Sequence, residues 1–291
     1  AGIRLDDPGA GARLAETEVI ATALTSVDRA VIEAAPNLRL VQAFGIGVNR
    51  HDVLALAERG ILIANTEGSN SVSTAEHGFM LALVLSRQFL RPYLDLKQQG
   101  AWRGAGEEAW ELAGKTMAIL GYGNIGRAVG RMARGFDMRV IAWNRRADQP
   151  RPPEDGVHFY PLEALLPEAD VLYIALPLSR QSRGLIGAEQ LALLKPSAIL
   201  INVGRGPIVD EVALIDAVDS GRLAGAGLDV TTQEPLPPDS PLLKVDRIVV
   251  TPHYGGGSRD SLARMRRYVV ENVVRYLRGE TPEHLVSADL A

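Results

Sequence analysis

Three side chains with the chemistry to bind an acid and transfer a proton lie far apart in the sequence but in similar surroundings. Arg205, Glu234 and His253 each follow an apolar run that is typical of a β-strand. Ligands bind parallel α/β sheets where strands give way to loops, so we expect these side chains to meet at one sheet edge. The planar fork of arginine suits a carboxylate. A carboxylate beside an imidazole favours the protonated ring, which can donate a proton.

Each of these residues also has a purely structural interpretation. Arg205 could tie down its own loop, and a single histidine in a loop is usually solvated or hydrogen-bonded within the protein. That interpretation, or a weak functional one, applies to the other histidines, which are His51, His77, His158 and His284. His253 differs because an arginine, a glutamate and a dinucleotide motif are expected at the same sheet edge. Together they can move a hydride and a proton.

The dinucleotide motif lies in the middle of the chain. An apolar run at 116–120 meets the sequence GYGNIG at 121–126, a helical pattern continues to Phe136, and a second apolar run covers 138–143. A strand, a glycine turn, a helix and a second strand are the context in which the pattern G-x-G-x-x-G binds a dinucleotide. The alternative is an ordinary turn between a strand and a helix. With both strands and the helix present, the segment predicts one half of a Rossmann fold.

The three glycines of this motif have different expected roles. Gly121 permits the tight turn, Gly123 lets backbone N–H groups approach a pyrophosphate, and Gly126 lets the helix pack against the strand. The first turn of the helix then presents unpaired N–H groups and the positive end of its dipole to the phosphates.

The residues after the second strand bear on the choice between NAD and NADP. In many NAD-binding proteins an acidic residue here accepts hydrogen bonds from the ribose hydroxyls. This sequence has Asn144 at that position, followed by Arg145 and Arg146. A carboxylate would repel a 2′-phosphate, whereas two arginines can bind it. The sequence therefore favours NADP, and NAD remains possible if both arginines are only solvated.

The composition excludes several classes of protein. The chain has 291 residues, 46% of them hydrophobic and 23% charged, which is enough for one large or two ordinary domains. A formal net charge of −4 gives no basic footprint for nucleic acid, and no apolar run reaches the roughly 18 residues of a membrane span. The sequence has no cysteine and shows no signal peptide. We therefore expect a cytoplasmic protein that binds neither nucleic acid, nor a membrane, nor a metal.

Apolar runs and helical patterns alternate along the chain, which predicts an α/β protein with two doubly wound, parallel-sheet domains. Ser26 is expected to cap the first helix, and the last helix is long enough to return to the first domain. The expected strands cover 19–24, 38–44, 61–64, 116–120, 138–143, 171–176, 198–203, 225–230 and 248–251, and the expected helices cover 27–35, 51–59, 70–89, 125–136, 162–166, 190–193, 211–220 and 258–278.

Four ordered motifs and a weaker fifth resemble the D-isomer-specific 2-hydroxyacid dehydrogenase family, over nearly the whole chain. The four are GYGNIG at 121–126, INVGRGPIVDE at 201–211, AGLDVTTQEPLP at 226–237 and TPHYGG at 251–256, and the weaker one is PNLRLVQAFGIGVNRHD at 36–52. Four motifs in the order and spacing of the family make a specific match.

The resemblance implies roles for the candidate residues. Arg205 would bind the substrate carboxylate and polarise the carbonyl, His253 would be the general acid in reduction, and Glu234 would be its partner. The backbone of Ile46 and Gly47 would also hold the carboxylate. The implied cofactor contacts are Thr74, Gly121, Gly123, Asn124, Ile125, Gly126, Asn144, Arg145, Arg146, Leu176, Pro177, Val203, Gly204, Asp229, Gly255 and Gly256.

The fold of the family is a Rossmann cofactor domain inserted into a flavodoxin-like catalytic domain. The resemblance places the catalytic domain at 1–72 and 260–291 and the NAD(P)-binding domain at 73–259. Members pair through their cofactor domains, and the apolar stretch 79–85 suits such an interface, so we expect a homodimer. The family usually begins with a strand and a helix for which this sequence, which lacks an initiator Met, shows no counterpart. We therefore expect an incomplete N-terminus.

Three functions are compatible with these residues. The resemblance favours an oxidoreductase that moves a hydride between NADP(H) and a small D-2-hydroxy acid or 2-oxo acid, of the glyoxylate/hydroxypyruvate reductase type. A phosphite dehydrogenase-like enzyme ranks lower, because residues 43–47 offer no lysine to bind the anion. The third possibility is a non-catalytic, corepressor-like protein that senses dinucleotides. The complete set of Arg205, Glu234 and His253 argues against it.

Overall fold

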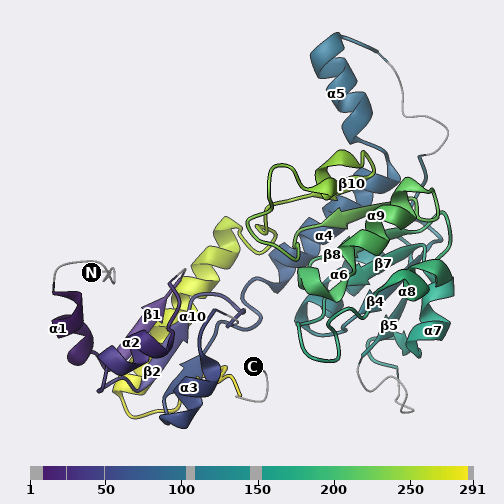
Figure 1. The fold of residues 1–291 in the computed structure, drawn as a ribbon. Helices are drawn as coiled ribbons and strands as arrows, with labels where there is room; N and C mark the ends of the chain where they lie inside the picture. The colour runs from purple at the N-terminus through teal and green to yellow at the C-terminus, as the bar shows by residue number, and fades with distance from the viewer. Residues whose placement is uncertain (1–8, 24, 49, 103–108, 145–152, 288–291) are drawn as a thin grey trace. The chain divides into compact units, whose positions relative to one another are not determined.

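The computed structural model divides into two compact units (Figure 1). The first unit consists of residues 1–70 and 258–291, and the second consists of residues 71–257. The structure describes residues 9–23, 25–48, 50–102, 109–144 and 153–287. Both units are α/β structures built on parallel sheets, which confirms the predicted fold class.

The first unit has a three-stranded parallel sheet in the order β1-β2-β3. Buried side chains of α1, α2 and α3 form a core with the strands, and α10 packs against β2. The strands are β1 (Val19–Thr22), β2 (Leu40–Ala43) and β3 (Leu62–Ala64), and the helices are α1 (Ala10–Ala15), α2 (Arg29–Ala34), α3 (Val53–Glu58) and α10 (Arg259–Leu277).

Aspartates begin two short helices of this unit. Asp28 accepts a hydrogen bond from the backbone N of Val31 at 3.0 Å, and Asp52 accepts one from the backbone N of Ala55 at 2.9 Å. The expectation that Ser26 caps α2 is therefore wrong, because Asp28 occupies the cap position. Each cap satisfies an N–H group that the helix leaves unpaired, which stabilises the helix by about 1 kcal/mol.

The long helix α10 ties the end of the chain to its beginning. The buried side chain of Asn272 donates to Oε1 of Gln42 on β2 at 2.8 Å, across 230 residues of sequence. The same side chain also pairs with the backbone of Glu283, and Gln42 donates to the carbonyl of Asn65 at 3.3 Å. Because buried amides are stable only when their hydrogen bonds are made, this contact fixes the register of α10 on the sheet.

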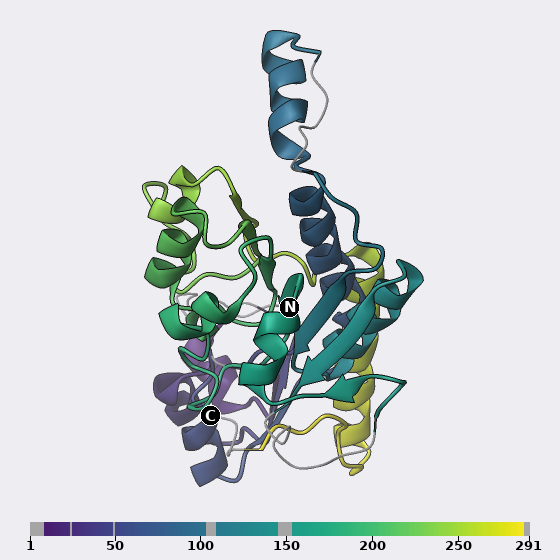
Figure 2. The same cartoon turned by 90° about the vertical axis from the view of Figure 1, so that its right-hand side faces the viewer.

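The second unit has a seven-stranded sheet in the order β10-β9-β8-β7-β4-β5-β6. Its neighbouring strands run in the same direction (Figure 2). The order reverses between β4 and β7, as at the ligand-binding switch point of a Rossmann sheet. The strands are β4 (Thr116–Leu120), β5 (Arg139–Trp143), β6 (His158–Phe159), β7 (Val171–Ile174), β8 (Ile199–Asn202), β9 (Gly225–Leu228) and β10 (Ile248–Val250).

Successive side chains of the central strands point into two different cores. Met117 and Ile119 of β4 pack with α4 and α6, whereas Ala118 and Leu120 pack with α8 and α9. Because helices cover both faces, these strands are continuous apolar runs. The helices are α4 (Ser71–Ser86), α5 (Leu90–Gln99), α6 (Asn124–Gly135), α7 (Leu162–Leu165), α8 (Ala188–Leu193) and α9 (Glu211–Asp219), with 3₁₀ turns at Leu166–Glu168, Gly206–Ile208 and Pro241–Lys244.

Helix α4 packs inside the second unit. Phe79, Leu81 and Ala82 are at most 5% exposed and share a core with α6. Burial within the unit therefore explains much of the apolar stretch 79–85. The expectation that this stretch forms a dimer interface is wrong for these three residues.

Helices α1 and α5 and strand β6 were not expected from the sequence. None of the residues of α5 is buried. Its apolar residues Leu90, Tyr93 and Leu94 have helical spacing but follow directly on a helix that was expected to end at Phe89, so no separate helix was predicted there. Strand β6 has two residues and α1 has six, which is too short for a periodic pattern.

Candidate active site

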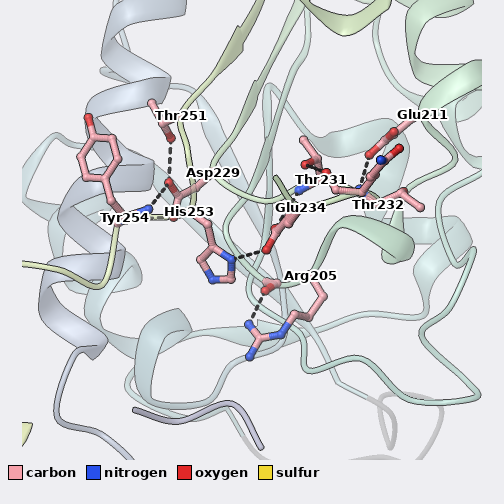
Figure 3. A network of polar contacts seen from close by, with 12 residues as sticks. Arg205, Glu211, Asp229, Thr231, Thr232, Glu234, Thr251, His253 and Tyr254 are labelled. Atoms are coloured by element: carbon pink, nitrogen blue, oxygen red, sulfur yellow. Dashed lines mark hydrogen bonds and ion pairs between the residues drawn. The ribbon is translucent and has the colours of Figure 1, made fainter. Parts of the chain in front are cut away.

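The three candidate residues lie where neighbouring strands of the second sheet end. Arg205 follows β8, Glu234 follows β9 and His253 follows β10. Figure 3 shows their side chains gathered at this edge. Because the strands are adjacent and parallel, their loops begin side by side, and the sheet brings together a cation, a carboxylate and an imidazole.

Glu234 and His253 form a direct pair. Nδ1 of His253 lies 2.7 Å from Oε2 of Glu234. An ionised carboxylate can only accept a hydrogen bond, so Nδ1 carries the hydrogen. Nε2 is then the nitrogen that can exchange a proton with a ligand. The His253 and Glu234 side chains are 45% and 33% exposed, which leaves the pair accessible to a small molecule.

The loop of Glu234 holds this carboxylate in place. Oε1 of Glu234 accepts a hydrogen bond from the backbone N of Thr231 at 3.1 Å. The Thr231 hydroxyl donates to the carbonyl of Gln233 at 2.8 Å. Glu211, on the neighbouring helix α9, accepts from the backbone N of Thr232 at 2.5 Å. Both oxygens of Glu234 therefore have protein partners.

The turn after β8 positions Arg205. The buried side chain of Asn202 accepts from the backbone N of Gly204 and donates to the carbonyl of Arg205, both at 3.0 Å. Nη1 of Arg205 donates to the carbonyl of Gly204 at 2.7 Å, the one hydrogen bond of its guanidinium within the described part of the chain. Burial lowers the pKa of Arg205, and the charge of Glu234 opposes that shift. A partly buried guanidinium with spare donors is suited to bind an anion.

The loops of Arg205 and Glu234 touch at Gly206. A Cβ added to Gly206 would overlap the backbone of Thr231 and Thr232. Only glycine therefore lets the two loops lie this close together.

The glycine motif contains one glycine that the packing of the protein itself does not require. A Cβ on Gly121, whose φ is +94°, would lie 2.9 Å from the carbonyl oxygen of Ala175, and a Cβ on Gly126 would overlap the carbonyl oxygen of Gly121. The fold itself requires these two glycines. Gly123 has nothing within 4 Å of such a Cβ, and it precedes α6 without a side-chain cap. The open space at this helix N-terminus fits a pyrophosphate.

Asn144 follows β5 and has a fixed orientation. Its Oδ1 accepts from the backbone N of Tyr122 at 2.8 Å. Because a backbone N–H can only donate, the amide oxygen must face Tyr122 and the NH₂ group must face away. Arg145 and Arg146, which were predicted to bind a 2′-phosphate, lie outside the described residues.

A small pocket lies next to the end of β5. It is lined mainly by apolar groups. The lining residues are Trp143, Leu176, Pro177, Ser179, Gln181 and Ser182.

Comparisons with known proteins cover most of the chain. Residues 79–255 match the family described as D-isomer specific 2-hydroxyacid dehydrogenase, NAD binding domain. The glyoxylate reductase of Korarchaeum cryptofilum is 39% identical over 284 residues, which cover 96% of this chain and 85% of that protein. The glyoxylate/hydroxypyruvate reductase B of Yersinia enterocolitica is 40% identical over 268 residues, which cover 90% of this chain and 81% of that protein. The chain belongs to the D-isomer specific 2-hydroxyacid dehydrogenase family.

A solved structure supports the same family. The crystal structure of a glyoxylate reductase from Paecilomyes thermophila matches with a TM-score of 0.84 at 32% sequence identity, and covers 92% of this chain and 83% of that chain. Membership makes the protein an NAD(P)-dependent D-2-hydroxyacid dehydrogenase. The NAD-binding match at 79–255 lies within the second unit, so the dehydrogenase binds its nicotinamide dinucleotide there.

The other predicted cofactor residues of the dehydrogenase begin helices or follow strands of the same sheet. A Cβ on Gly204 would lie 2.6 Å from the carbonyl oxygen of Leu176, so the loops after β7 and β8 pack closely. Thr74 is in the first turn of α4, Asn124, Ile125 and Gly126 begin α6, Leu176 and Pro177 follow β7, Val203 and Gly204 follow β8, Asp229 follows β9, and Gly255 and Gly256 follow β10.

The predicted substrate residues Ile46 and Gly47 lie in the first unit. Asn65 donates to the carbonyl of Ile46 at 3.0 Å. Thr66 accepts from the backbone N of Gly45 at 3.1 Å and donates its own N–H to the Gly45 carbonyl at 3.0 Å. These bonds fix the loop whose N–H groups are expected to hold the substrate carboxylate.

Sequence reasoning missed three residues that shape this site. Asn202 and Glu211 both lie inside the motif INVGRGPIVDE, so their motif was recognised but their hydrogen bonds were not. His77 was assigned at most a weak functional role, because nothing in the sequence indicates which side chains meet it. The structure places His77 beside Asp229 and Thr251.

Within the described ranges, no helix combines the length and the apolar character needed to cross a membrane. The described His, Asp and Glu side chains form no group of three or more that could hold a metal ion.

Proposed function

We propose that the protein reduces a small 2-oxo acid, of the glyoxylate or hydroxypyruvate type, to the D-2-hydroxy acid with NADPH. The observation that carries this proposal is the 2.7 Å contact between His253 and Glu234, which lies at the same sheet edge as Arg205. A cation for the carboxylate and an oriented acid for the carbonyl oxygen are what such a reduction requires.

Each of the three residues has a defined part in this reaction. Arg205 binds the substrate carboxylate and polarises the carbonyl. When bound, the reduced nicotinamide supplies the hydride that is added to the carbonyl carbon. Protonated His253 gives its Nε2 proton to the carbonyl oxygen, which becomes the hydroxyl, and is left as a neutral imidazole. Glu234 holds the ring through Nδ1 and stabilises its charged form.

In this proposal one unit binds the cofactor and the other binds the substrate. We propose that the NAD(P)-binding domain spans residues 73–259 and that residues 1–72 and 260–291 form the substrate domain. The N–H groups of Ile46 and Gly47 in the substrate domain also hold the carboxylate. The bonds from Asn65 and Thr66 to their loop support this role, because they preorganise the backbone.

The preference for NADP rests on the residues after β5. The NH₂ group of Asn144 is turned away from Tyr122, and it offers donors to a 2′-phosphate where an aspartate would repel it. Arg145 and Arg146 add two positive charges at this point of the sequence. One charge-assisted hydrogen bond to the phosphate stabilises the complex by about 1.5–3 kcal/mol, which corresponds to a preference of about 10–150-fold for NADPH.

A single set of assays tests both parts of the proposal. We would measure kcat/KM for glyoxylate, hydroxypyruvate and bulkier 2-oxo acids, each with NADPH and with NADH. His253→Ala should reduce turnover of the best acid by about 10²–10⁴-fold, because it removes the general acid. A variant with near wild-type turnover would exclude His253 as the proton donor.

The cofactor assignment is tested by the double variant Arg145→Ala, Arg146→Ala. Its preference for NADPH should collapse because kcat/KM with NADPH falls, while kcat/KM with NADH changes little. If the wild-type protein prefers NADH, or the double variant keeps its NADPH preference, the two arginines are solvated surface residues. The roles of Arg205, Glu234 and His253 would survive that result.

The dehydrogenase is also proposed to be a homodimer joined through its cofactor domains. Helix α5 supports this, because none of its residues is buried against the described residues of its own unit. Tyr93, Leu94 and Leu96 are 42–45% exposed, and Phe89 just before the helix is 52% exposed. A second copy of the chain would cover this surface.

A further inference from the structure

A buried histidine outside the proposed catalytic set contacts the loop that carries His253. The side chain of His77, on helix α4, is 8% exposed. Its Nε2 lies 2.8 Å from Oγ1 of Thr251 and 3.3 Å from Oδ1 of Asp229. Its ring meets the ring of Tyr254 edge-on, with 4.8 Å between the centroids. Thr251 and Tyr254 lie on either side of His253 in the sequence.

Asp229 is the centre of this cluster. Its Oδ1 accepts from the Thr251 hydroxyl at 2.7 Å and from the backbone N of Tyr254 at 3.2 Å, and its Oδ2 accepts from the backbone N of Gly255 at 2.9 Å. One carboxylate thus holds the loop before and after His253, as Figure 3 shows for Thr251 and Tyr254. His253 itself has φ +50°, a conformation that non-glycine residues rarely adopt without support from their surroundings.

The hydrogens of the cluster can be assigned by counting donors. The Thr251 hydroxyl has one hydrogen, and Asp229 receives it because an ionised carboxylate cannot donate. Toward His77 the same hydroxyl can then only accept. Nε2 of His77 therefore carries a hydrogen, shared between Thr251 and Asp229, whether the ring is neutral or charged.

The cluster is built around an ionised Asp229. Burial alone would raise the pKa of Asp229, but hydrogen bonds from His77, Thr251 and Gly255 outweigh burial and hold that pKa below its ordinary value. On strand β7, which β8 separates from β9, burial and the charge of Asp229 raise the pKa of Tyr173, which therefore stays a neutral phenol. Among the described residues, His77 is the side chain outside the 251–255 loop that donates to this carboxylate.

Packing leaves little freedom in this arrangement. A Cβ on Gly255 would lie 2.7 Å from Oδ2 of Asp229 and 2.9 Å from Cδ2 of His77. The backbone of the loop is therefore pressed against both side chains. A displacement of His77 or Asp229 must be passed on to the residues that flank His253.

We infer that His77 is a positioning residue of the reaction: it donates to Asp229 and Thr251, and through them it fixes the loop that presents His253 to Glu234. The inference rests on the proposed function, because it takes His253 as the proton donor. No contact between His77 and a ligand is required. The histidine acts through the carboxylate that it orients.

Two substitutions at one position test this role. His77→Phe keeps a ring of similar size against Tyr254 but removes the donor, whereas His77→Gln keeps an N–H donor at a similar distance from Cα. We expect kcat for 2-oxo acid reduction to fall by about 10- to 100-fold in His77→Phe, as when a reacting group is misplaced by about 1 Å. His77→Gln should stay within about threefold of wild type, since it retains the hydrogen bond.

A matched control separates positioning from loss of stability. Phe79→Leu alters a buried residue of the same helix that packs against Phe136 and not against the Asp229 cluster. It should lower the melting temperature without lowering kcat of the folded protein. If Phe79→Leu and His77→Phe lose kcat equally, or if His77→Gln is as impaired as His77→Phe, His77 has only a structural role.

A readout that needs no turnover distinguishes this inference from the proposed function. In protein labelled with ¹³C-histidine, the Cε1–Hε1 signal of His253 is identified by its loss in His253→Ala. We expect His77→Phe to shift this signal and its pH response, and His77→Gln and Phe79→Leu to leave both unchanged. An unchanged His253 signal in His77→Phe would overturn the inference, even if the protein reduced every acid in the panel. A shifted signal in a protein without reductase activity would support the positioning role and refute only the proposed function.

Discussion

Gly123→Ala should weaken cofactor binding without weakening the fold. A Cβ at this position meets no protein atom within 4 Å, so the added methyl group is compatible with the structure of the protein alone. It would, however, occupy the open space at the N-terminus of α6 in which the pyrophosphate is expected. The substitution therefore tests the space that the cofactor needs separately from the space that the folded turn needs.

The size of both effects follows from the contacts. If the methyl group removes one charge-assisted hydrogen bond between a backbone N–H and a phosphate, about 1.5–3 kcal/mol is lost. The Kd for NADPH should then rise by about 10- to 150-fold. The cost to the helix of replacing a glycine cap by alanine is about 1 kcal/mol or less, so the melting temperature should fall by only a few degrees.

Two glycines within α6 provide matched controls for Gly123, which precedes the helix. Gly135 also has open space around a Cβ, so Gly135→Ala should bind NADPH normally and gain up to about 1 kcal/mol from its higher helix propensity. Gly126→Ala would overlap the carbonyl of Gly121 and should destabilise the fold itself. Titration calorimetry with NADPH and thermal unfolding of each variant distinguish these cases. If Gly123→Ala binds NADPH as tightly as Gly135→Ala, this turn does not cradle the pyrophosphate.

Three further predictions concern other parts of the protein. Arg205→Lys should lower kcat/KM by about tenfold or more, because lysine keeps the charge but loses the fork that binds a carboxylate. If the variant has the same steady-state kcat/KM as the wild type, Arg205 does not bind the substrate. Asp229→Asn should cost about 1–3 kcal/mol in the free energy of unfolding at neutral pH, measured by urea denaturation. The pKa of Asp229 is lowered in the fold, so the contribution of Asp229 to the free energy of unfolding is complete above the ordinary pKa of 3.8 and is lost as pH falls through the lower folded pKa. A difference in the free energy of unfolding between wild type and Asp229→Asn that does not narrow with acid contradicts this assignment. Tyr93→Glu combined with Leu96→Glu should convert a dimer into a monomer in light scattering, and a monomeric wild-type protein would refute the dimer.

The sequence was most informative where burial is strongest. The strand at 116–120 was predicted with the bounds that the structure gives it, because both faces of β4 are covered and the whole run is apolar. Helix α6 was predicted within one residue at each end, because its glycine turn and its periodic pattern agree. Helix α5 was missed, although Leu90, Tyr93 and Leu94 have helical spacing, because the preceding helix was expected to end at Phe89 and no second helix was expected after it.

The contact between Glu234 and His253 could be anticipated from topology, since both follow strands that the α/β alternation places at one sheet edge. The hydrogen bonds that hold these two residues in place could not be anticipated. The bonds of Glu211 to Thr232 and of His77 to Asp229 depend on how helices are placed over loops, and hydrophobic periodicity does not determine this. Motifs therefore indicated which residues meet, and the structure was needed to show what holds them.

The hydrogen bond between Asn272 and Gln42 has a consequence for the order in which the chain folds during synthesis. Gln42 leaves the ribosome 230 residues before its partner Asn272, so the contact between the sheet of the first unit and α10 cannot form until α10 has been made. The second unit is one continuous segment, residues 71–257, and all of its strands are available before α10 is made. Because domains fold as units once their residues have emerged, we expect the nucleotide-binding unit to form first and the amino-terminal strands to be the last part of the protein to become stable.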